Sequence, residues 1–200
     1  MLENVYANEE DLETNPRQSA EIAEDTPVPL RIFKIYTSPH KGEPMVEQKE
    51  ITVIEGKGII GDRYYLDSFD GYFDNHNVPN SERVITLISL EGIERGNKTI
   101  QEKGGTPMKP EETRRNLVVN VDVDTLDALI GEEFEVGGIR MKGVAASTPC
   151  WRPPTLAGRV EDTVPFIHGF LHNGGIRAIP LTSGLIREGD PIILPKTESP

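Results

Sequence analysis

Short segments rich in valine and isoleucine, separated by glycine or proline, constrain the fold of this chain more than any other feature. The 200 residues include 19 glycines and 16 prolines, and both residue types interrupt regular secondary structure. Short runs of branched side chains are typical of β-strands. We predict strands at Leu30–Tyr36, Glu50–Ile54, Val84–Ser89, Asn116–Val121, Glu133–Val136, Ile139–Val144, Ile176–Leu181 and Pro191–Leu194. Many short strands favour a mainly β fold, a barrel or a folded sheet, with few helices.

One tight hairpin and two helices are predicted among these strands. Gly137 and Gly138 can supply the positive φ angles of a two-residue turn. Apolar residues near a helical period predict a helix over Leu90–Glu102. A second helix is predicted over Thr155–Leu171, where the apolar spacings are four, four, three and four, and Pro165 is expected to kink or split it.

Charge is distributed unevenly along the chain. The formal net charge is −12, and the first 25 residues contain eight acidic residues and one arginine. Because this segment has too few apolar residues to offset its ordering entropy, residues 1–28 are predicted to form a disordered acidic tail, and residues 29–195 a single domain. The acidic balance opposes binding to nucleic acid, since affinity for a phosphate backbone comes from clustered Lys and Arg.

The sequence carries no signal for a membrane. No apolar run approaches the roughly 20 residues of a membrane helix. The first residues also lack the basic and apolar regions of a secretory signal. We therefore expect a cytoplasmic protein with no membrane partner.

The single cysteine, Cys150, excludes an internal disulfide and any all-cysteine zinc site. It lies in the loop Ser147–Trp151, where a thiolate could act as a nucleophile or as a soft-metal ligand. The alternative is a buried and inert cysteine, which is common in proteins. His168 and His172 have a zinc-like spacing, but a third ligand is missing, so capping or surface roles are favoured.

A second candidate is the motif Thr113-Arg114-Arg115-Asn116 at the start of a predicted strand. Arginine forks bind phosphate or carboxylate, and an asparagine amide offers both a donor and an acceptor. An anionic small molecule would suit this group. Alternatively, one arginine pairs with a neighbouring glutamate while the other is solvated.

A third candidate is the glycine-rich segment 56–64, which contains Lys57 and Arg63. Its backbone N–H groups and basic side chains could surround an anion. The spacing matches neither the P-loop nor the dinucleotide-binding pattern, and a simple turn between strands is an equal alternative. Further along, Gly174 and Gly175 indicate a helix stop followed by a strand that carries Arg177.

Taken together and in order, five motifs resemble the MOSC domain family, named for the C-terminal domain of molybdenum cofactor sulfurases. The resemblance covers residues 30–194. The motifs are GIIGDRY (58–64), TRRNLVV (113–119), LIGEEFEVGG (129–138), PCW (149–151) and GGIRAIPLTSGLIREGDPI (174–192).

This resemblance implies a barrel-like β fold with peripheral helices that holds a molybdenum–pterin cofactor or carries sulfur on a cysteine. Relatives include reducers of N-hydroxylated compounds and domains that accept sulfur for cofactor maturation. By the resemblance, Cys150 is the thiolate that ligates molybdenum or bears a persulfide. The implied cofactor contacts are Arg114 and Asn116 of an R-x-N motif, with Thr113, Arg115, Thr148, Arg63 and Arg177 near them.

One departure from the family pattern concerns sulfur exchange. Many relatives have C-x-x-C, whereas Ser147 stands at the first of those positions, so an exchange between two thiols is not available.

We identify no pyridoxal phosphate site, and no iron–sulfur, haem or flavin motif. An enzyme would therefore need a separate reductase, and a sulfur carrier a separate desulfurase. A third hypothesis is a scaffold with an inert cysteine. In an enzyme or in a sulfur carrier, the loop Tyr65–Ser81 could act as a lid over the site.

Overall fold

The computed structural model describes residues 29–65 and 85–195. The predicted acidic tail and most of the predicted lid, Tyr65–Ser81, lie outside these residues. The described part contains the strands β1 (Ile32–Thr37), β2 (Val46–Gln48), β3 (Glu50–Ile54), β4 (Gly58–Ile59), β5 (Ile85–Ser89), β6 (Leu117–Val119), β7 (Glu133–Val136), β8 (Ile139–Ala146), β9 (Ile176–Pro180), β10 (Gly184–Arg187) and β11 (Ile192–Ile193).

The strands form one large curled sheet and one small sheet. The large sheet has the order β11-β7-β8-β9-β5-β6-β1-β2, and the small one the order β10-β3-β4. Among the described strands, β5 and β6 form the one parallel pair. The large sheet curls back on itself, because Arg31 before β1 pairs with Pro191 before β11. The prediction of a mainly β, barrel-like fold is thus confirmed.

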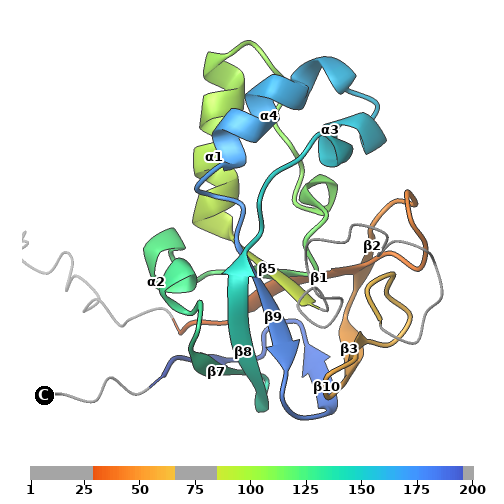
Figure 1. Cartoon of the computed structure of the whole chain (residues 1–200), viewed down its shortest axis with the longest axis vertical. Helices are drawn as coiled ribbons and strands as arrows, with labels where there is room; N and C mark the ends of the chain where they lie inside the picture. Colours follow the sequence, from red (N-terminus) through yellow and green to blue (C-terminus); the bar gives the residue numbers. More distant parts are fainter. Residues whose placement is uncertain (1–28, 66–84, 196–200) are drawn as a thin grey trace, which may run out of the picture.

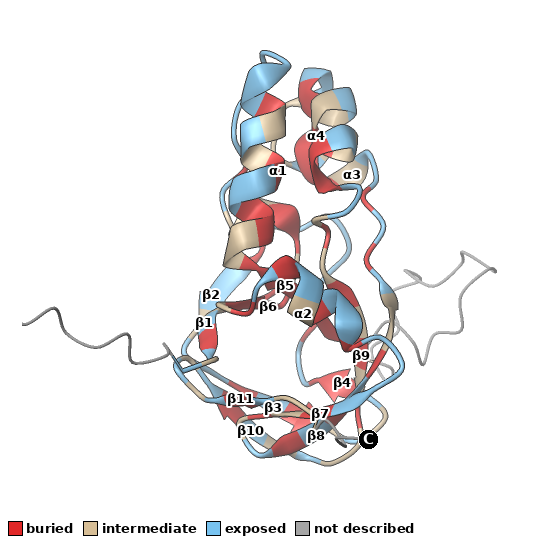
Figure 2. Ribbon diagram, turned by 90° about the vertical axis from the view of Figure 1, so that its left-hand side faces the viewer, coloured by how far each residue is buried: buried red, intermediate tan, exposed pale blue. Residues whose placement is uncertain are grey.

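The interior of the curled sheet is the main hydrophobic core. Branched side chains from the strands alternate into it, and residues such as Ile35, Leu87, Leu117 and Ile176 are fully buried. In Figure 2 buried positions run along the strands of the sheet and also occur on helices α1 and α4. Such burial is the dominant favourable contribution to folding and makes the sheet a rigid support for loops at its ends.

Three helices stand above one end of the sheet, namely α1 (Leu90–Glu102), α3 (Arg152–Leu156) and α4 (Thr163–Phe170), whereas α2 (Val123–Ala128) lies lower, beside β8 (Figure 1). Short 3-10 turns are η2 (Glu111–Thr113) and η3 (Val160–Asp162). Helices α1 and α4 approach closely because Gly169 faces the backbone of Gly96, where a Cβ atom would overlap a carbonyl oxygen. Phe166 and Phe170 fill the second core beside them.

The structure confirms the eight predicted strands, with ends shifted by at most two residues, and the helix Leu90–Glu102. The predicted turn is also confirmed, since Gly137 and Gly138 have φ angles of 59° and 79°. The short strands β2, β4 and β10 and the helix α2 were not predicted. No helix in the described ranges is long and apolar enough to cross a membrane.

The prediction of one helix over Thr155–Leu171 is wrong. Gly158 adopts a left-handed conformation with φ of 75°, which ends α3, and the chain continues as η3 and α4. Pro165 lies in the first turn of α4, where a missing N–H group is tolerated. The apolar stripe is largely exposed, including Val160 and Val164.

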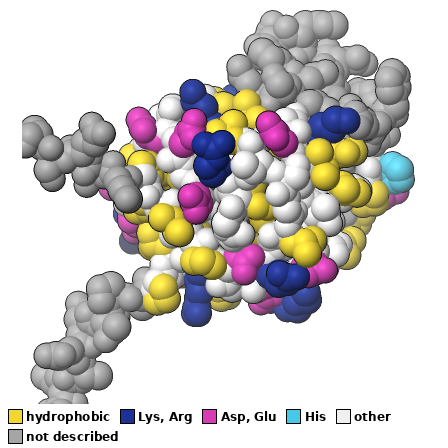
Figure 3. All heavy atoms as spheres, turned by 90° about the horizontal axis from the view of Figure 1, so that it is seen from below, with side chains coloured by type: hydrophobic (Ala, Val, Ile, Leu, Met, Phe, Trp, Pro, Cys, Tyr) yellow, Lys and Arg dark blue, Asp and Glu magenta, His cyan; other side chains and the backbone are white. Residues whose placement is uncertain are grey.

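The surface at the sheet end carries charges of both signs. In Figure 3, which views the molecule from below, acidic and basic side chains are interspersed among hydrophobic ones. Among the described residues visible in this view, neither charge forms a continuous area.

Candidate functional site

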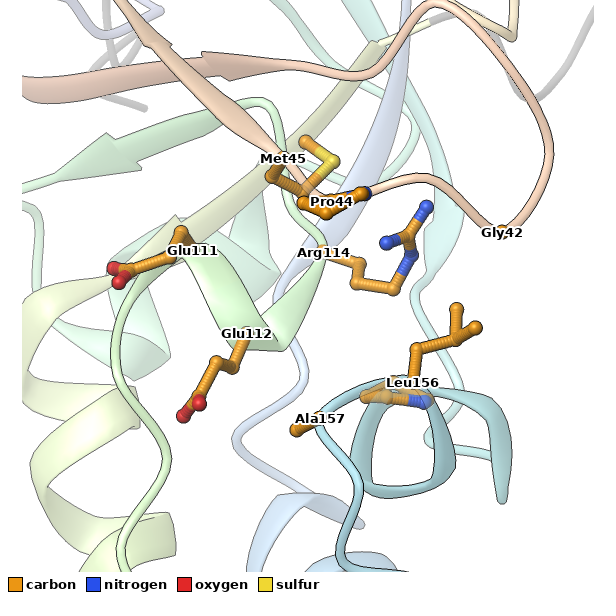
Figure 4. Close-up of a pocket in the computed structure, with 9 residues that line it drawn as sticks. Gly42, Pro44, Met45, Glu111, Glu112, Arg114, Leu156 and Ala157 are labelled. Atoms are coloured by element: carbon orange, nitrogen blue, oxygen red, sulfur yellow. The ribbon is translucent and has the colours of Figure 1, made fainter.

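The candidate site is built from loops that meet where α3 and η2 approach the connection between β1 and β2. A cavity of about 230 Å³ lies between them (Figure 4). Its walls are Gly42, Pro44 and Met45 before β2, Glu111, Glu112 and Arg114 around η2, and Pro153, Leu156 and Ala157 of the α3 segment. The lining thus combines apolar side chains with three charged ones, as in many small-molecule sites.

Arg114 is the cationic group of this cavity. It is 7% exposed, and it is the one non-glycine residue with a positive φ, 63°, in the described part of the chain. A left-handed conformation costs an L-residue about 1–2 kcal/mol. In Figure 4 the guanidinium lies between Pro44 and Leu156. Its Nη1 donates to the carbonyl of Glu43 at 2.7 Å, which fixes the side chain at the cavity wall.

The backbone of Arg114 is held by a buried arginine of the glycine-rich segment. Nη2 of Arg63 donates to the Arg114 carbonyl at 3.1 Å, and Nη1 donates to the sulfur of Met45 at 2.9 Å. The Arg63 side chain is 1% exposed. The segment 56–64 therefore supports the cavity from behind, with its arginine turned into the protein.

The carboxylate of Glu112 is neutralised within the protein. One of its oxygens accepts from Nη2 of Arg159 at 2.6 Å and from the backbone N–H of Lys109 at 2.7 Å. The charge of Glu112 therefore opposes an anion beside Arg114 less, whereas the carboxylate of Glu111 is a second negative group in the lining.

A fully buried polar network lies next to this cavity. Asn116 accepts from the Thr86 hydroxyl at 2.8 Å, and donates to the Tyr36 carbonyl at 3.2 Å and to Asp62 at 3.1 Å. The same Asp62 oxygen accepts from the backbone N–H of Ser38 at 3.0 Å. These bonds join β1, β5, β6 and the glycine-rich segment at one point. Burial also raises the pKa of Tyr36 to about 12.

The fold and these motifs agree with a comparison to known protein families. The family model described as MOSC domain matches residues 60–193, two thirds of the chain. The chain belongs to the MOSC domain family. Among curated proteins, the comparison found no match.

Solved structures show the same fold as this MOSC domain. YuaD from Bacillus subtilis has a TM-score of 0.68 and 19% identity, over 82% of this chain and 94% of that one. YiiM from Geobacillus stearothermophilus has a TM-score of 0.56 and 15% identity, over 84% and 76% of the two chains. YiiM from Escherichia coli has a TM-score of 0.52 and 14% identity, over 86% and 71%.

The cysteine of the MOSC domain is accessible. Cys150 is exposed, which contradicts the alternative of a buried, inert cysteine. It lies three residues before Pro153, a wall of the cavity, although Cys150 itself does not line that cavity. Thr148 is also exposed, whereas Ser147 and Pro149 are buried. The thiol is thus presented on a short segment with buried anchors on both sides.

Further predicted site residues are buried or half-buried and do not line the cavity, namely Thr113, Arg115, Asn116 and Arg177. Thr113 is buried in η2, and its hydroxyl donates to the Pro110 carbonyl at 2.7 Å. Arg115 donates to main-chain carbonyls, and the Asn116 amide bonds Thr86, Tyr36 and Asp62 within the protein. Arg177 is half-buried on β9, opposite Thr86 of β5. The assignment of these residues as cofactor contacts stays a prediction.

Sequence reasoning missed the structural members of this site. Asp62 and Thr86 are both buried and hold Asn116, and neither was predicted as a partner of Asn116. Thr86 had a signal, because it is a polar residue between the apolar Ile85 and Leu87 of a strand. His168 and His172 are exposed, and the described residues contain no group of three or more metal-ligating side chains of the His, Cys, Asp and Glu types.

Proposed function

We propose that this MOSC domain binds a molybdenum–pterin cofactor, with Cys150 as its thiolate ligand and Arg114 as a contact for its anionic part. The observation that carries the proposal is an exposed single thiol, Cys150, three residues before Pro153. Pro153 lines a cavity that the guanidinium of Arg114 also lines. Molybdenum in a dithiolene is soft enough to favour a thiolate ligand, and its phosphate favours an arginine fork.

The donor set supports this fit in two respects. The thiol is accessible on a short loop, and the guanidinium lies at the wall of a cavity of about 230 Å³. This volume is somewhat below the roughly 300–1,000 Å³ of typical ligand pockets, so it suits one end of the cofactor rather than all of it. The exposed hydroxyl of Thr148 is available beside the thiol.

The reaction that suits such a site is reduction of an N-hydroxylated compound. The N–O bond breaks, two electrons and two protons are taken up, and water is released. The bound cofactor supplies the redox chemistry, and a separate reductase supplies the electrons. Within this chain, Cys150 holds the metal, and Arg114 neutralises and orients the anionic end of the cofactor.

Metal and pterin content test this proposal. The full chain is produced in a host that makes the cofactor, and molybdenum is measured by elemental analysis and pterin by fluorescence after oxidative release. We expect molybdenum near one atom per chain, lost in Cys150→Ser with the fold retained by circular dichroism. Arg95→Met, a change on the exposed face of α1, serves as the matched control and should keep the metal. Wild-type protein without molybdenum or pterin would refute the proposal.

A second function is favoured by the exposure of Cys150, namely a carrier of persulfide sulfur or of the cofactor without turnover. An accessible thiol can be reached by the active site of a separate desulfurase. After incubation with a desulfurase and cysteine, this function predicts a mass increase of one sulfur atom on wild-type protein and none on Cys150→Ser. An unchanged wild-type mass excludes persulfide transfer.

A further inference from the structure

The guanidinium of Arg115 binds main-chain carbonyls of three separate segments. Its Nε donates to the Gly174 carbonyl at 2.8 Å, its Nη2 to the Ser147 carbonyl at 3.1 Å, and its Nη1 to the Thr113 carbonyl at 3.3 Å. Gly174 precedes β9, Ser147 follows β8, and Thr113 ends η2. One side chain therefore connects three loops at the same end of the sheet.

The two more distant loops also contact each other closely. The Ser147 N–H donates to the Gly175 carbonyl at 2.7 Å. A Cβ atom on Gly174 would overlap the Ser147 carbonyl oxygen, so only glycine allows this approach. The Ser147 carbonyl is thus held by Arg115 on one side and limited by Gly174 on the other.

This contact determines where the reactive segment begins. Ser147 is buried, and Cys150 follows it by three residues. At the far end of the segment, the buried Pro153 and Pro154 anchor the start of α3. The Trp151 carbonyl is further fixed by the Thr155 hydroxyl at 2.9 Å. Between these anchors the position of the thiol depends on the position of Ser147.

We infer that Arg115 is a positioning residue for Cys150, which acts by holding the Ser147 carbonyl against the loop before β9. The inference deepens the proposed function, in which Cys150 is the metal ligand. The planar fork of arginine reaches several carbonyls at fixed angles, whereas the ammonium of lysine is a single point donor on a flexible stem. Position 115 therefore requires arginine for its geometry, and charge alone does not suffice.

The test compares Arg115→Lys and Arg115→Met with wild type and with the control Arg95→Met, all as full chains. Hydrogen exchange of the Ser147 amide reports the junction directly, because that N–H donates to Gly175. Loss of charge-assisted bonds is expected to speed its exchange at least about tenfold in both Arg115 variants, with exchange in β7 unchanged. If Arg115→Met does not fold, the exchange measurement is made on Arg115→Lys alone.

Alkylation of Cys150 and metal content supply the second readout. Because the chain has one cysteine, iodoacetamide labelling followed across pH reports this thiol alone. A positioning role predicts that the lysine and methionine variants share one altered labelling profile. A lysine variant with wild-type exchange and labelling would overturn the inference. So would a loss of molybdenum with unchanged Ser147 exchange, which would make Arg115 a direct cofactor contact. If wild-type protein lacks molybdenum, the proposed function fails, and the exchange result still decides the role of Arg115.

Discussion

Replacement of Gly174 by alanine perturbs the loop junction with a single methyl group. The Gly174 backbone does not have a positive φ, so alanine introduces no conformational strain there. The new Cβ would overlap the Ser147 carbonyl oxygen and lie 3.0 Å from the Phe170 carbonyl oxygen. Both are main-chain atoms, which cannot rotate away as a side chain can. The two loops must therefore separate.

The magnitude follows from two contributions. Overpacking a well-packed region costs about 1–3 kcal/mol. Displacement of the Ser147 carbonyl also weakens its bond from Arg115, and a bond to a charged group contributes about 1.5–3 kcal/mol. Because the loops relax in part, we expect Gly174→Ala to lower the free energy of unfolding by about 2–4 kcal/mol.

Gly184→Ala is the matched control for this measurement. Gly184 also lacks a positive φ, and its nearest neighbour is the flexible Cδ1 of Ile139 at 3.3 Å. Both variants gain the same reduction in unfolded-state entropy, so their difference isolates the steric effect. Urea unfolding followed by circular dichroism measures both, and Gly184→Ala should stay within about 1 kcal/mol of wild type. Equal unfolding free energies for the two variants would refute the argument about Ser147.

Two further predictions concern single backbone features. Arg114→Gly and Arg114→Ala lose the same guanidinium bonds, but only the alanine variant keeps the strain of the left-handed backbone. Urea unfolding should therefore show the glycine variant to be more stable by about 0.5–1 kcal/mol. An alanine variant of equal or greater stability contradicts this prediction. The Asp122 carboxylate accepts from the Thr125 N–H at 2.8 Å, which lowers the pKa of Asp122. Its stabilising effect is therefore present above the ordinary pKa near 3.8 and is lost as the pH falls further. Asp122→Ala should cost about 1 kcal/mol at pH 7 and progressively less below pH 4, and a pH-independent difference would exclude capping by the charged group.

Local sequence patterns predicted the elements whose structure depends on near neighbours. Strands β3 and β7 and the helix α1 have the predicted bounds, because alternation or helical period is complete within each. Strand β10 was missed, since its four residues become a strand only by pairing with β3. The prediction of one helix over Thr155–Leu171 was wrong for a related reason. Its apolar spacing is helical, but the left-handed Gly158 interrupts it.

The orientation of the site residues was not predictable from the sequence. Arg114 lines a cavity and Cys150 is exposed, while their roles as cofactor contact and metal ligand stay predictions. The sequence contained no sign that Arg115 would bind carbonyls 32 and 59 residues away in the chain. Nor did it indicate that Asn116 would bind Thr86 and Asp62 inside the protein. Such orientations depend on which distant loops the sheet brings together.

The left-handed backbone at Arg114 explains how two adjacent arginines serve different surroundings. It ends η2 and turns the chain toward β6, so that Arg114 lines the cavity while Arg115 reaches the loops after β8 and before β9. Strain of this kind persists only where neighbouring groups hold it, and here Arg63 binds the Arg114 carbonyl. The cavity and the start of the Cys150 segment are therefore coupled through one residue. Loss of the Arg114 side chain alone affects the cavity, whereas a change in its backbone conformation displaces Arg115 and, through Ser147, the thiol.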